Sequence, residues 1–324
     1  MNFPSLPATI PTNSTLDSMS HQARTFASKS RARRTVEGYR SDWLRFQRWC
    51  MNRSLQESPA SPSTVADYLI SATSGPDARK VGTIGRWLAA ISSAHRFAGL
   101  PDPTQDPAVQ LVWQGIRREL GTRQHGKTAL LTHDIKRMVE PLTDSPLDAR
   151  DRALLLVGFA SMLRRSELVA LDVDDLTSTD DGLKILVRKS KTDQQGAGQE
   201  IGIPFGEHPS TCPVLALRRW LDLATITHGA VFRQVRRGGH ITARRLSSQV
   251  VGLIVKNRAS GAGIDATNLA GHSLRRGLAT SAARAGVSNR SIQRQGRWKS
   301  PTMVDRYVED AALFVDNAAA RVGL

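Results

Sequence analysis

The sequence predicts a mainly α-helical protein of two domains, with one small antiparallel β-sheet in the second domain. Apolar residues recur at the three- and four-residue spacing of amphipathic helices along most of the chain. Pairs of a capping residue and proline, Ser61-Pro62 and Asp106-Pro107, stand where two of these stretches begin. A length of 324 residues allows two separate cores.

The first domain is expected to be a helical bundle over residues 21–120, behind a disordered tail at residues 1–20 that is rich in Ser, Thr and Pro. Thr35 is the expected N-cap of the first helix. That helix carries an apolar stripe at 3,4,3,4 spacing: Val36, Tyr39, Trp43, Phe46 and Cys50. The other helices are expected to begin at Ser61-Pro62, near Thr83 and at Asp106-Pro107.

A basic segment without apolar periodicity, residues 121–128 (GTRQHGKT), is the expected linker to a second domain at residues 129–324. Thr132 is expected to cap the first helix of that domain. Residues 183–189 and 200–203 are expected to form a hairpin around a polar loop at 190–198. Further helices are predicted at 147–163, 213–224, 246–259, 273–285, 288–295 and 301–308.

The net charge of +16 is spread over the whole chain. Residues 1–125 hold 16 basic and 9 acidic residues, and the remainder hold 29 and 20. Such a distribution favours DNA, because each neutralised phosphate releases counterions; an anionic membrane surface is the weaker alternative. The candidate DNA-contacting residues are Arg31, Arg33, Arg34, Arg86, Arg96, Arg123 and Lys127.

Other features exclude some protein classes. No apolar run approaches the roughly 20 residues that span a bilayer, and the N-terminus does not have the pattern of a secretory signal. The two cysteines, Cys50 and Cys212, have no metal-binding spacing, so a cytoplasmic protein is expected. The acidic run Asp172, Asp174 and Asp175 is interpreted as a polar turn and not as a Mg²⁺ site.

Three stretches carry candidate chemistry. Residues 163–168 (LRRSEL) place arginine at a junction between helices. His272 and Arg275 share one face of the first turn of a predicted helix, where a phosphate is favoured. Tyr307 lies 32 residues beyond Arg275 and nine beyond Trp298. The other two tyrosines fit apolar stripes, so Tyr307 is expected to have no core role.

Alone, each stretch is common in proteins of other functions. In this order, L-R-x-S-E-L, a hairpin lysine, H-x-x-R and a Tyr behind G-x-W resemble the catalytic domain of the tyrosine recombinases, the phage integrase family. The likeness spans roughly residues 25–310. It implies a core-binding domain of SAM-like fold at 21–120 and a catalytic domain at 129–324 that ends in a docking segment.

The resemblance also implies the role of each residue. Tyr307 matches the nucleophile, and Arg164 matches the first arginine, with Arg165 in a variable position. His272 and Arg275 match the H-x-x-R pair, and Trp298 takes a position where most members have His. The hairpin lysine is Lys191, with Lys189 as the alternative.

These residue types suit transfer of a phosphodiester to tyrosine. Two guanidiniums stabilise negative charge on the oxygens of a five-coordinate phosphorus, His272 accepts the tyrosine proton, and Lys191 protonates the leaving 5′-oxygen. The expected product is a 3′-phosphotyrosyl ester. No metal, ATP or other cofactor is expected.

The resemblance implies that two domains clamp double-stranded DNA, that a homotetramer joins paired sites, and that strands exchange through a Holliday junction. No membrane partner is expected, and accessory DNA-bending proteins remain open. The apolar residues 311–320 dock either on their own domain or, as favoured, on a neighbouring protomer. Two alternatives are a type IB topoisomerase-like enzyme and a DNA-binding protein with a vestigial site. Integration, excision and resolution are not distinguished.

Overall fold

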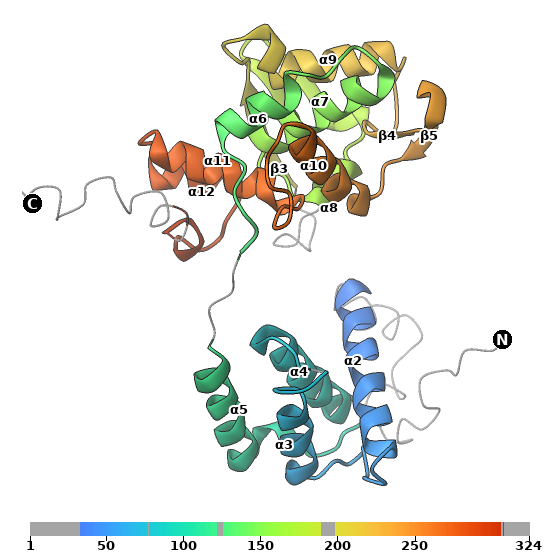
Figure 1. Cartoon of the computed structure of the whole chain (residues 1–324), viewed down its shortest axis with the longest axis vertical. Helices are drawn as coiled ribbons and strands as arrows, with labels where there is room; N and C mark the ends of the chain where they lie inside the picture. The colour runs from blue at the N-terminus through green and yellow to red at the C-terminus, as the bar shows by residue number, and fades with distance from the viewer. Residues whose placement is uncertain (1–32, 77, 122–125, 189–197, 306, 308–324) are drawn as a thin grey trace, which may run out of the picture. The chain divides into compact units, whose positions relative to one another are not determined.

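The computed structural model describes residues 33–76, 78–121, 126–188, 198–305 and 307 (Figure 1). The predicted tail at 1–20, the docking segment at 311–320, Arg31, Arg123, Lys189 and Lys191 lie outside these residues. The chain divides into two compact units, residues 1–125 and 126–324. Each is described by itself below.

The first unit is helical in its described part. It contains α2 (Arg33–Met51), α3 (Pro62–Ser71), α4 (Val81–Phe97), a short 3₁₀ turn (Pro103–Gln105) and α5 (Pro107–Leu120). The Ser61 side chain accepts a hydrogen bond from the Thr64 backbone N–H at 3.1 Å, and Asp106 accepts one from Ala108 at 2.8 Å. Both predicted caps are therefore confirmed, since each satisfies a backbone donor that the helix leaves open.

The predicted start of the first helix is wrong. The helix begins at Arg33, so Thr35 lies inside it and does not cap it. Val36, predicted to be buried, is 47% exposed. The hydrophobic core is contacted by the half-buried Trp43 and by residues further along the helix, such as the buried Phe46. The first turn of the helix therefore extends beyond the hydrophobic core, and its apolar residue Val36 has no core to pack against.

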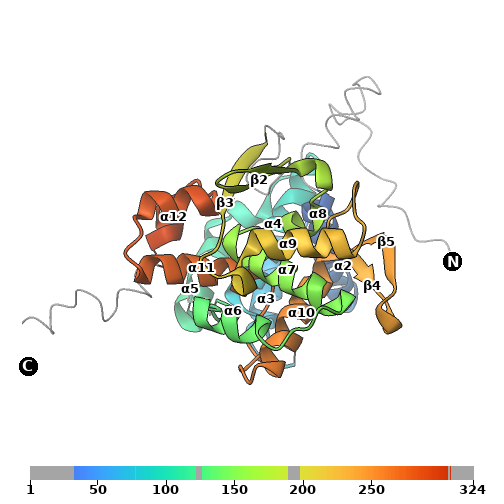
Figure 2. The same cartoon turned by 90° about the horizontal axis from the view of Figure 1, so that it is seen from above.

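The second unit is built around α7 (Pro146–Ala160), which is buried on nearly all sides. Figure 2 shows α7 beneath α9 (Pro213–Leu223), and it also contacts α6 (Thr132–Val139), α8 (Arg165–Ala170) and α11 (His272–Arg284). The second half of α7, residues 153–159, is apolar all round, as expected of a helix segment in the centre of a core. The described part of this unit also contains α10 (Ser248–Gly261) and α12 (Asn289–Gly296), and residues 302–305 are helical as well.

The described residues contain two small antiparallel sheets, where one was predicted. The first has the order β1 (Leu176–Thr179), β2 (Gly182–Val187) and β3 (Gln199–Pro204), and the second pairs β4 (Arg233–Val235) with β5 (Ile241–Arg245). Strand β2 was predictable because buried and exposed residues alternate along it. Strands β1, β4 and β5 are short and contain no fully buried residue, so they lack that alternation.

Two helix ends near the candidate site differ from the prediction. Thr132 is the first helical residue and not the cap; Asp134 accepts a hydrogen bond from the Leu131 backbone N–H at 2.8 Å instead. Helix α7 ends at Ala160, and Met162 has a positive φ of 51°. This early end produces the turn that carries Arg164. No helix in the described part of the chain is both long enough and apolar enough to cross a membrane.

Candidate active site

Arg164 lies in the turn between α7 and α8 and is the N-cap residue of α8. Its backbone N–H donates to Glu167 Oε2 at 2.9 Å, and its Nη1 donates to Glu167 Oε1 at 2.6 Å. The Glu167 side chain is 4% exposed and the Arg164 side chain 21%. Glu167 thus fixes both the main chain and the guanidinium of Arg164, which stays within reach of solvent. The neighbouring Arg165 is exposed.

Helix α11 begins at His272 and carries Arg275 one turn later. Close packing sets its position: a Cβ on Gly277 would lie 1.8 Å from the Leu130 carbonyl oxygen, so only glycine fits there. The Leu130 backbone N–H also donates to the Ser273 carbonyl at 3.2 Å. The predicted H-x-x-R pair is therefore at the start of a helix that is held tightly against the strand-like segment before α6.

Arg275 is almost completely buried, with 1% of its surface exposed. Its Nη1 and Nη2 donate to the Met162 and Gly296 carbonyls, and its guanidinium lies 4.6 Å from the centre of the Trp298 ring. Burial, followed by the charges of Arg164 and Arg297, lowers the pKa of Arg275 to about 10. The side chain is still a cation at neutral pH. A guanidinium has five N–H donors, so two carbonyls do not exhaust them.

His272 is solvent-accessible but surrounded by cations. Partial loss of hydration, and then the charges of Arg275, Arg164 and Arg276, lower the pKa of His272 below its ordinary value. The imidazole is therefore neutral at pH 7 and can accept a proton.

Tyr307 stacks on Trp298, with ring centres 5.2 Å apart and planes inclined by 29°. Both residues are buried and form a small apolar cluster with Met162, Ile292 and Val304, among others. The expectation that Tyr307 has no core role is wrong, because Trp298 provides a packing partner that the linear sequence does not place beside it. Arg275 and Tyr307 both contact the Trp298 ring, so the two residues lie near each other.

The structure therefore brings together Arg164, His272, Arg275, Trp298 and Tyr307. Lys191 lies outside the described residues. Two further members were not predicted. Glu167 stood inside the quoted motif, where an acidic residue three positions after an N-cap is a recognisable signal. Arg297 gave no such signal, because its position depends on how α12 ends. Its Nη2 donates to Glu167 Oε2 at 2.5 Å.

The predicted DNA-contacting residues have different environments. Arg33 and Arg34 lie in α2, and Arg96 is exposed near the end of α4. Arg86 is bound to Asp42 through Nε at 2.6 Å and Nη2 at 2.9 Å, and this hydrogen-bonded pairing raises the pKa of Arg86. Lys127 donates to Asn268 Oδ1 at 3.2 Å. Arg86 is thus committed to an ion pair inside its own unit.

A basic hairpin formed by β4 and β5 was missed by the sequence analysis. Arg236, Arg237 and Arg244 are exposed on it. Arg245 anchors the hairpin to α8 and the following turn, because its Nη1 donates to the Val169 and Leu171 carbonyls at 2.8 and 3.0 Å. Helix α8, which begins next to Arg164, therefore also supports the hairpin.

The acidic turn at 172–175 is held by arginines. Asp172 contacts Arg245 Nη2 at 2.5 Å, and Asp175 contacts Arg188 Nε at 2.5 Å. Paired with cations in this way, these carboxylates fit the interpretation as a polar turn.

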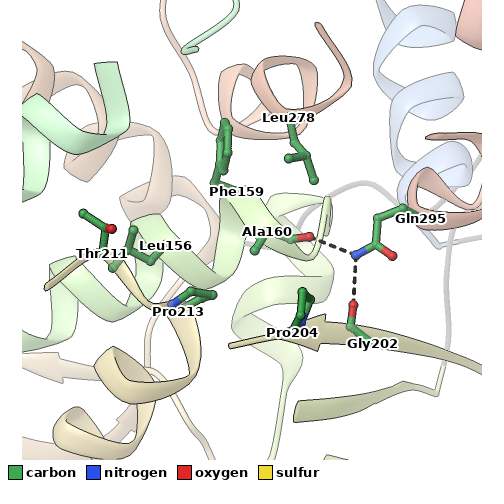
Figure 3. A pocket seen from close by; sticks show the side chains of 9 residues that line it. All are labelled: Leu156, Phe159, Ala160, Gly202, Pro204, Thr211, Pro213, Leu278 and Gln295. Atoms are coloured by element: carbon green, nitrogen blue, oxygen red, sulfur yellow. Dashed lines mark hydrogen bonds between the residues drawn. The ribbon is translucent and has the colours of Figure 1, made fainter. Parts of the chain in front are cut away.

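An apolar pocket of about 390 Å³ lies beside the site, between α7, β3, α9, α11 and α12 (Figure 3). The Gln295 side chain of α12 lies at one edge of the pocket and donates to the Ala160 carbonyl at 2.9 Å and the Gly202 carbonyl at 3.2 Å (Figure 3). The pocket is lined by Leu156, Phe159, Ala160, Gly202, Pro204, Thr211, Pro213, Leu278 and Gln295. The helix that precedes Trp298 is thereby tied to α7 and to the sheet.

Comparisons with known proteins identify the family to which the chain belongs. The model of the phage integrase family matches residues 128–313. An integrase/recombinase xerD homolog of Selenomonas ruminantium is 40% identical over 308 residues, covering 94% of this chain and 89% of the relative. The recombinase Cre of Escherichia phage P1 is 27% identical over 281 residues, covering 81% and 80%.

Among solved structures, a lambda integrase dimer bound to a COC′ core site has a TM-score of 0.59 at 18% identity, covering 91% of this chain and 95% of that one. The Tn1549 transposon integrase in complex with transposon right end DNA has a TM-score of 0.61 at 14% identity, covering 90% and 95%. These likenesses show the same fold. The chain therefore belongs to the phage integrase family, and it is a tyrosine site-specific recombinase.

Proposed function

We propose that this recombinase breaks DNA with Tyr307 and that Arg164, His272 and Arg275 carry the chemistry with it. The observation that supports this most directly is that Arg275 and Tyr307 contact the same Trp298 ring. Arg164 and the neutral imidazole of His272 lie near Arg275. Metal-independent transfer of a phosphate to a side chain requires such a set, because the developing charge needs donors and the nucleophile needs a base.

In the proposed reaction, the Tyr307 oxygen attacks phosphorus as the bond to the 5′-oxygen breaks. His272 accepts the phenol proton, and Lys191 supplies a proton to the 5′-oxygen. Arg164 and Arg275 bind the non-bridging oxygens through N–H groups not used elsewhere. The 3′-phosphotyrosyl ester keeps the energy of the broken bond, so a 5′-hydroxyl of another strand can reverse the step.

A plasmid topology assay tests this function against its alternatives. Plasmids with two target sites should yield recombined circles that depend on Tyr307, and plasmids without a site should remain supercoiled. Relaxation of every plasmid would indicate a type IB topoisomerase-like enzyme. Binding without any change of topology would indicate a vestigial site. We place this reaction in the cytoplasm, where bacterial and phage DNA is accessible.

We further propose that the hairpin of β4 and β5 binds DNA phosphates through Arg236, Arg237 and Arg244. It is exposed, strongly basic and anchored beside Arg164. Changing all three to Gln should weaken binding and reduce the slope of log affinity against log salt by up to about 3, roughly one for each lost phosphate contact.

The matched control removes the same charge elsewhere. Lys184 of β2 and Arg218 and Arg219 of α9 are exposed, and their change to Gln lowers the net charge equally. Gel shifts at several salt concentrations compare the two triple variants. If both triple variants lose the same DNA affinity, the effect is one of net charge alone. The hairpin is then not part of the DNA interface.

Recombination by this family requires protomers to meet on DNA, and we propose that residues 311–320 provide the contact. They are apolar, begin four positions after Tyr307, and match in character the apolar pocket of Figure 3. We assign them to the pocket of a neighbouring protomer in a homotetramer. Nothing in this proposal excludes accessory DNA-bending proteins.

Truncation after Asp310 should leave folding and binding to a single site intact and abolish synapsis and strand exchange. Phe314→Ala should act in the same direction but more weakly, because one buried aromatic side chain is lost. Sedimentation of the protein with two-site DNA measures the assembly. If the truncated protein still forms a four-protomer complex and recombines, the segment docks on its own chain.

A further inference from the structure

Arg297 ends α12 in an unusual way. The helix closes with a Schellman motif, in which the Trp298 backbone N–H donates to the Gln293 carbonyl and the Arg297 N–H to the Arg294 carbonyl, both at 3.1 Å. The motif requires a left-handed residue, and Arg297 has φ 52° and ψ 44°. Glycine adopts this conformation without strain, whereas a residue with a Cβ does not. An arginine at this position accepts that strain and places a long cationic side chain where glycine would place none.

The side chain of Arg297 is buried beside the active site. It is 3% exposed and bound to Glu167, whose carboxylate also holds Arg164. Within the described part of the chain, its Nε and Nη1 have no hydrogen-bond partner. Buried donors without acceptors are unfavourable, so a role in stability alone does not explain this arrangement.

Glu167 thus lies between two guanidiniums, and its two oxygens are divided between them. Oε1 accepts from Arg164 at 2.6 Å, and Oε2 accepts from the Arg164 backbone at 2.9 Å and from Arg297 at 2.5 Å. Without Arg297, the full charge of the buried carboxylate would act on Arg164 and hold it away from an incoming phosphate. With Arg297, much of that charge is already neutralised.

The charges of the cluster support the same conclusion. Arg164 and Arg297 lie close enough to Arg275 to repel its guanidinium. Glu167 is the carboxylate that lies among these three arginines. Three cations and one anion give a net charge of about +2. The phosphodiester carries one negative charge and gains a second at the five-coordinate transition state, so the cluster balances the transition state better than the substrate.

We propose that Arg297 is a positioning residue for DNA cleavage, which acts through Glu167 to leave Arg164 available for the scissile phosphate. The proposal rests on the proposed function. It gives the variable residue of the G-x-W motif a role in the rate of cleavage and not in DNA binding.

Arg297→Gly is the decisive variant, because glycine fits the left-handed position and the helix end should keep its conformation. With saturating protein and a nicked suicide substrate, the single-turnover rate of adduct formation should fall by about 10-fold, a typical size for coupled pairs in one network. The affinity in gel shifts should stay within about twofold. Arg297→Lys, which keeps the charge but loses the paired geometry, should give an intermediate rate.

A double-mutant cycle separates positioning from a general structural effect. If Arg297 acts through Glu167, adding Arg297→Gly to Glu167→Gln should reduce the rate little further. If the two losses multiply, or if Arg297→Gly cleaves as fast as the unaltered protein, the proposal is wrong. If thermal unfolding shows that Glu167→Gln is not folded, the cycle is run with Arg164→Lys instead, because Arg164 is the partner of Glu167 in the same ion pair.

Failure of the proposed function gives a different result. If the unaltered protein forms no Tyr307-dependent adduct, the proposed function and this inference fall together. If it forms the adduct and the cycle is multiplicative, only the role of Arg297 is refuted.

Discussion

Tyr307→Phe should abolish covalent attachment to DNA and leave binding nearly unchanged. The substitution removes one oxygen and no charge. Tyr307 stacks on Trp298 with ring centres 5.2 Å apart, and a phenylalanine ring can stack in the same way. The apolar cluster around the site should therefore persist. A nicked suicide duplex traps the intermediate because the released strand cannot return, and a denaturing gel then shows the protein–DNA adduct.

The control uses a tyrosine of the first unit. Tyr39→Phe makes the same chemical change in the first unit, and the variant should still form the adduct. An adduct that persists in Tyr307→Phe would assign the nucleophile to another residue, whereas loss of binding in a gel shift would mean that the substitution damages the fold.

Arg164→Ala should lower the cleavage rate on the order of 10²-fold or more, as is typical when one donor to a developing anion is deleted. Its side chain is 21% exposed, and Glu167 keeps Arg297 as a partner, so the melting temperature should change little. Arg275→Ala should lose a similar factor and also stability. It would leave the Met162 and Gly296 carbonyls unpaired in the interior, at a cost of roughly 1–3 kcal/mol each.

Arg165→Ala is the matched control. Arg165 is adjacent to Arg164 and exposed, so it should cleave at close to the unaltered rate. Single-turnover cleavage and thermal unfolding, measured on the same protein samples, separate the chemical effect from the structural one. If Arg165→Ala lowers the cleavage rate more than Arg164→Ala does, the first arginine of the motif is Arg165 and not Arg164.

Much of the fold was predictable from local chemistry. The caps Ser61 and Asp106 and the alternating strand β2 depend on a few neighbouring residues, and the structure has them as predicted. The family was also predictable, because the order and spacing of LRRSEL, H-x-x-R and Tyr are properties of the chain itself.

Features that depend on distant partners were not predictable. Strands β4 and β5 are Arg-rich and half-buried at most, and Arg245 is held by carbonyls more than 70 positions earlier. The burial of Tyr307 required Trp298, and the environment of Arg275 required carbonyls from two other segments.

The sequence by itself determined the fold class, the family and the residues that match its motif, because helix periodicity, capping and motif spacing are encoded over short stretches. Only the tertiary structure decided how those residues are supported. Glu167 meets Arg297 across 130 positions, and a helix end in the left-handed conformation makes that contact. No local pattern encodes such a contact, since burial and charge pairing arise when separate segments pack together.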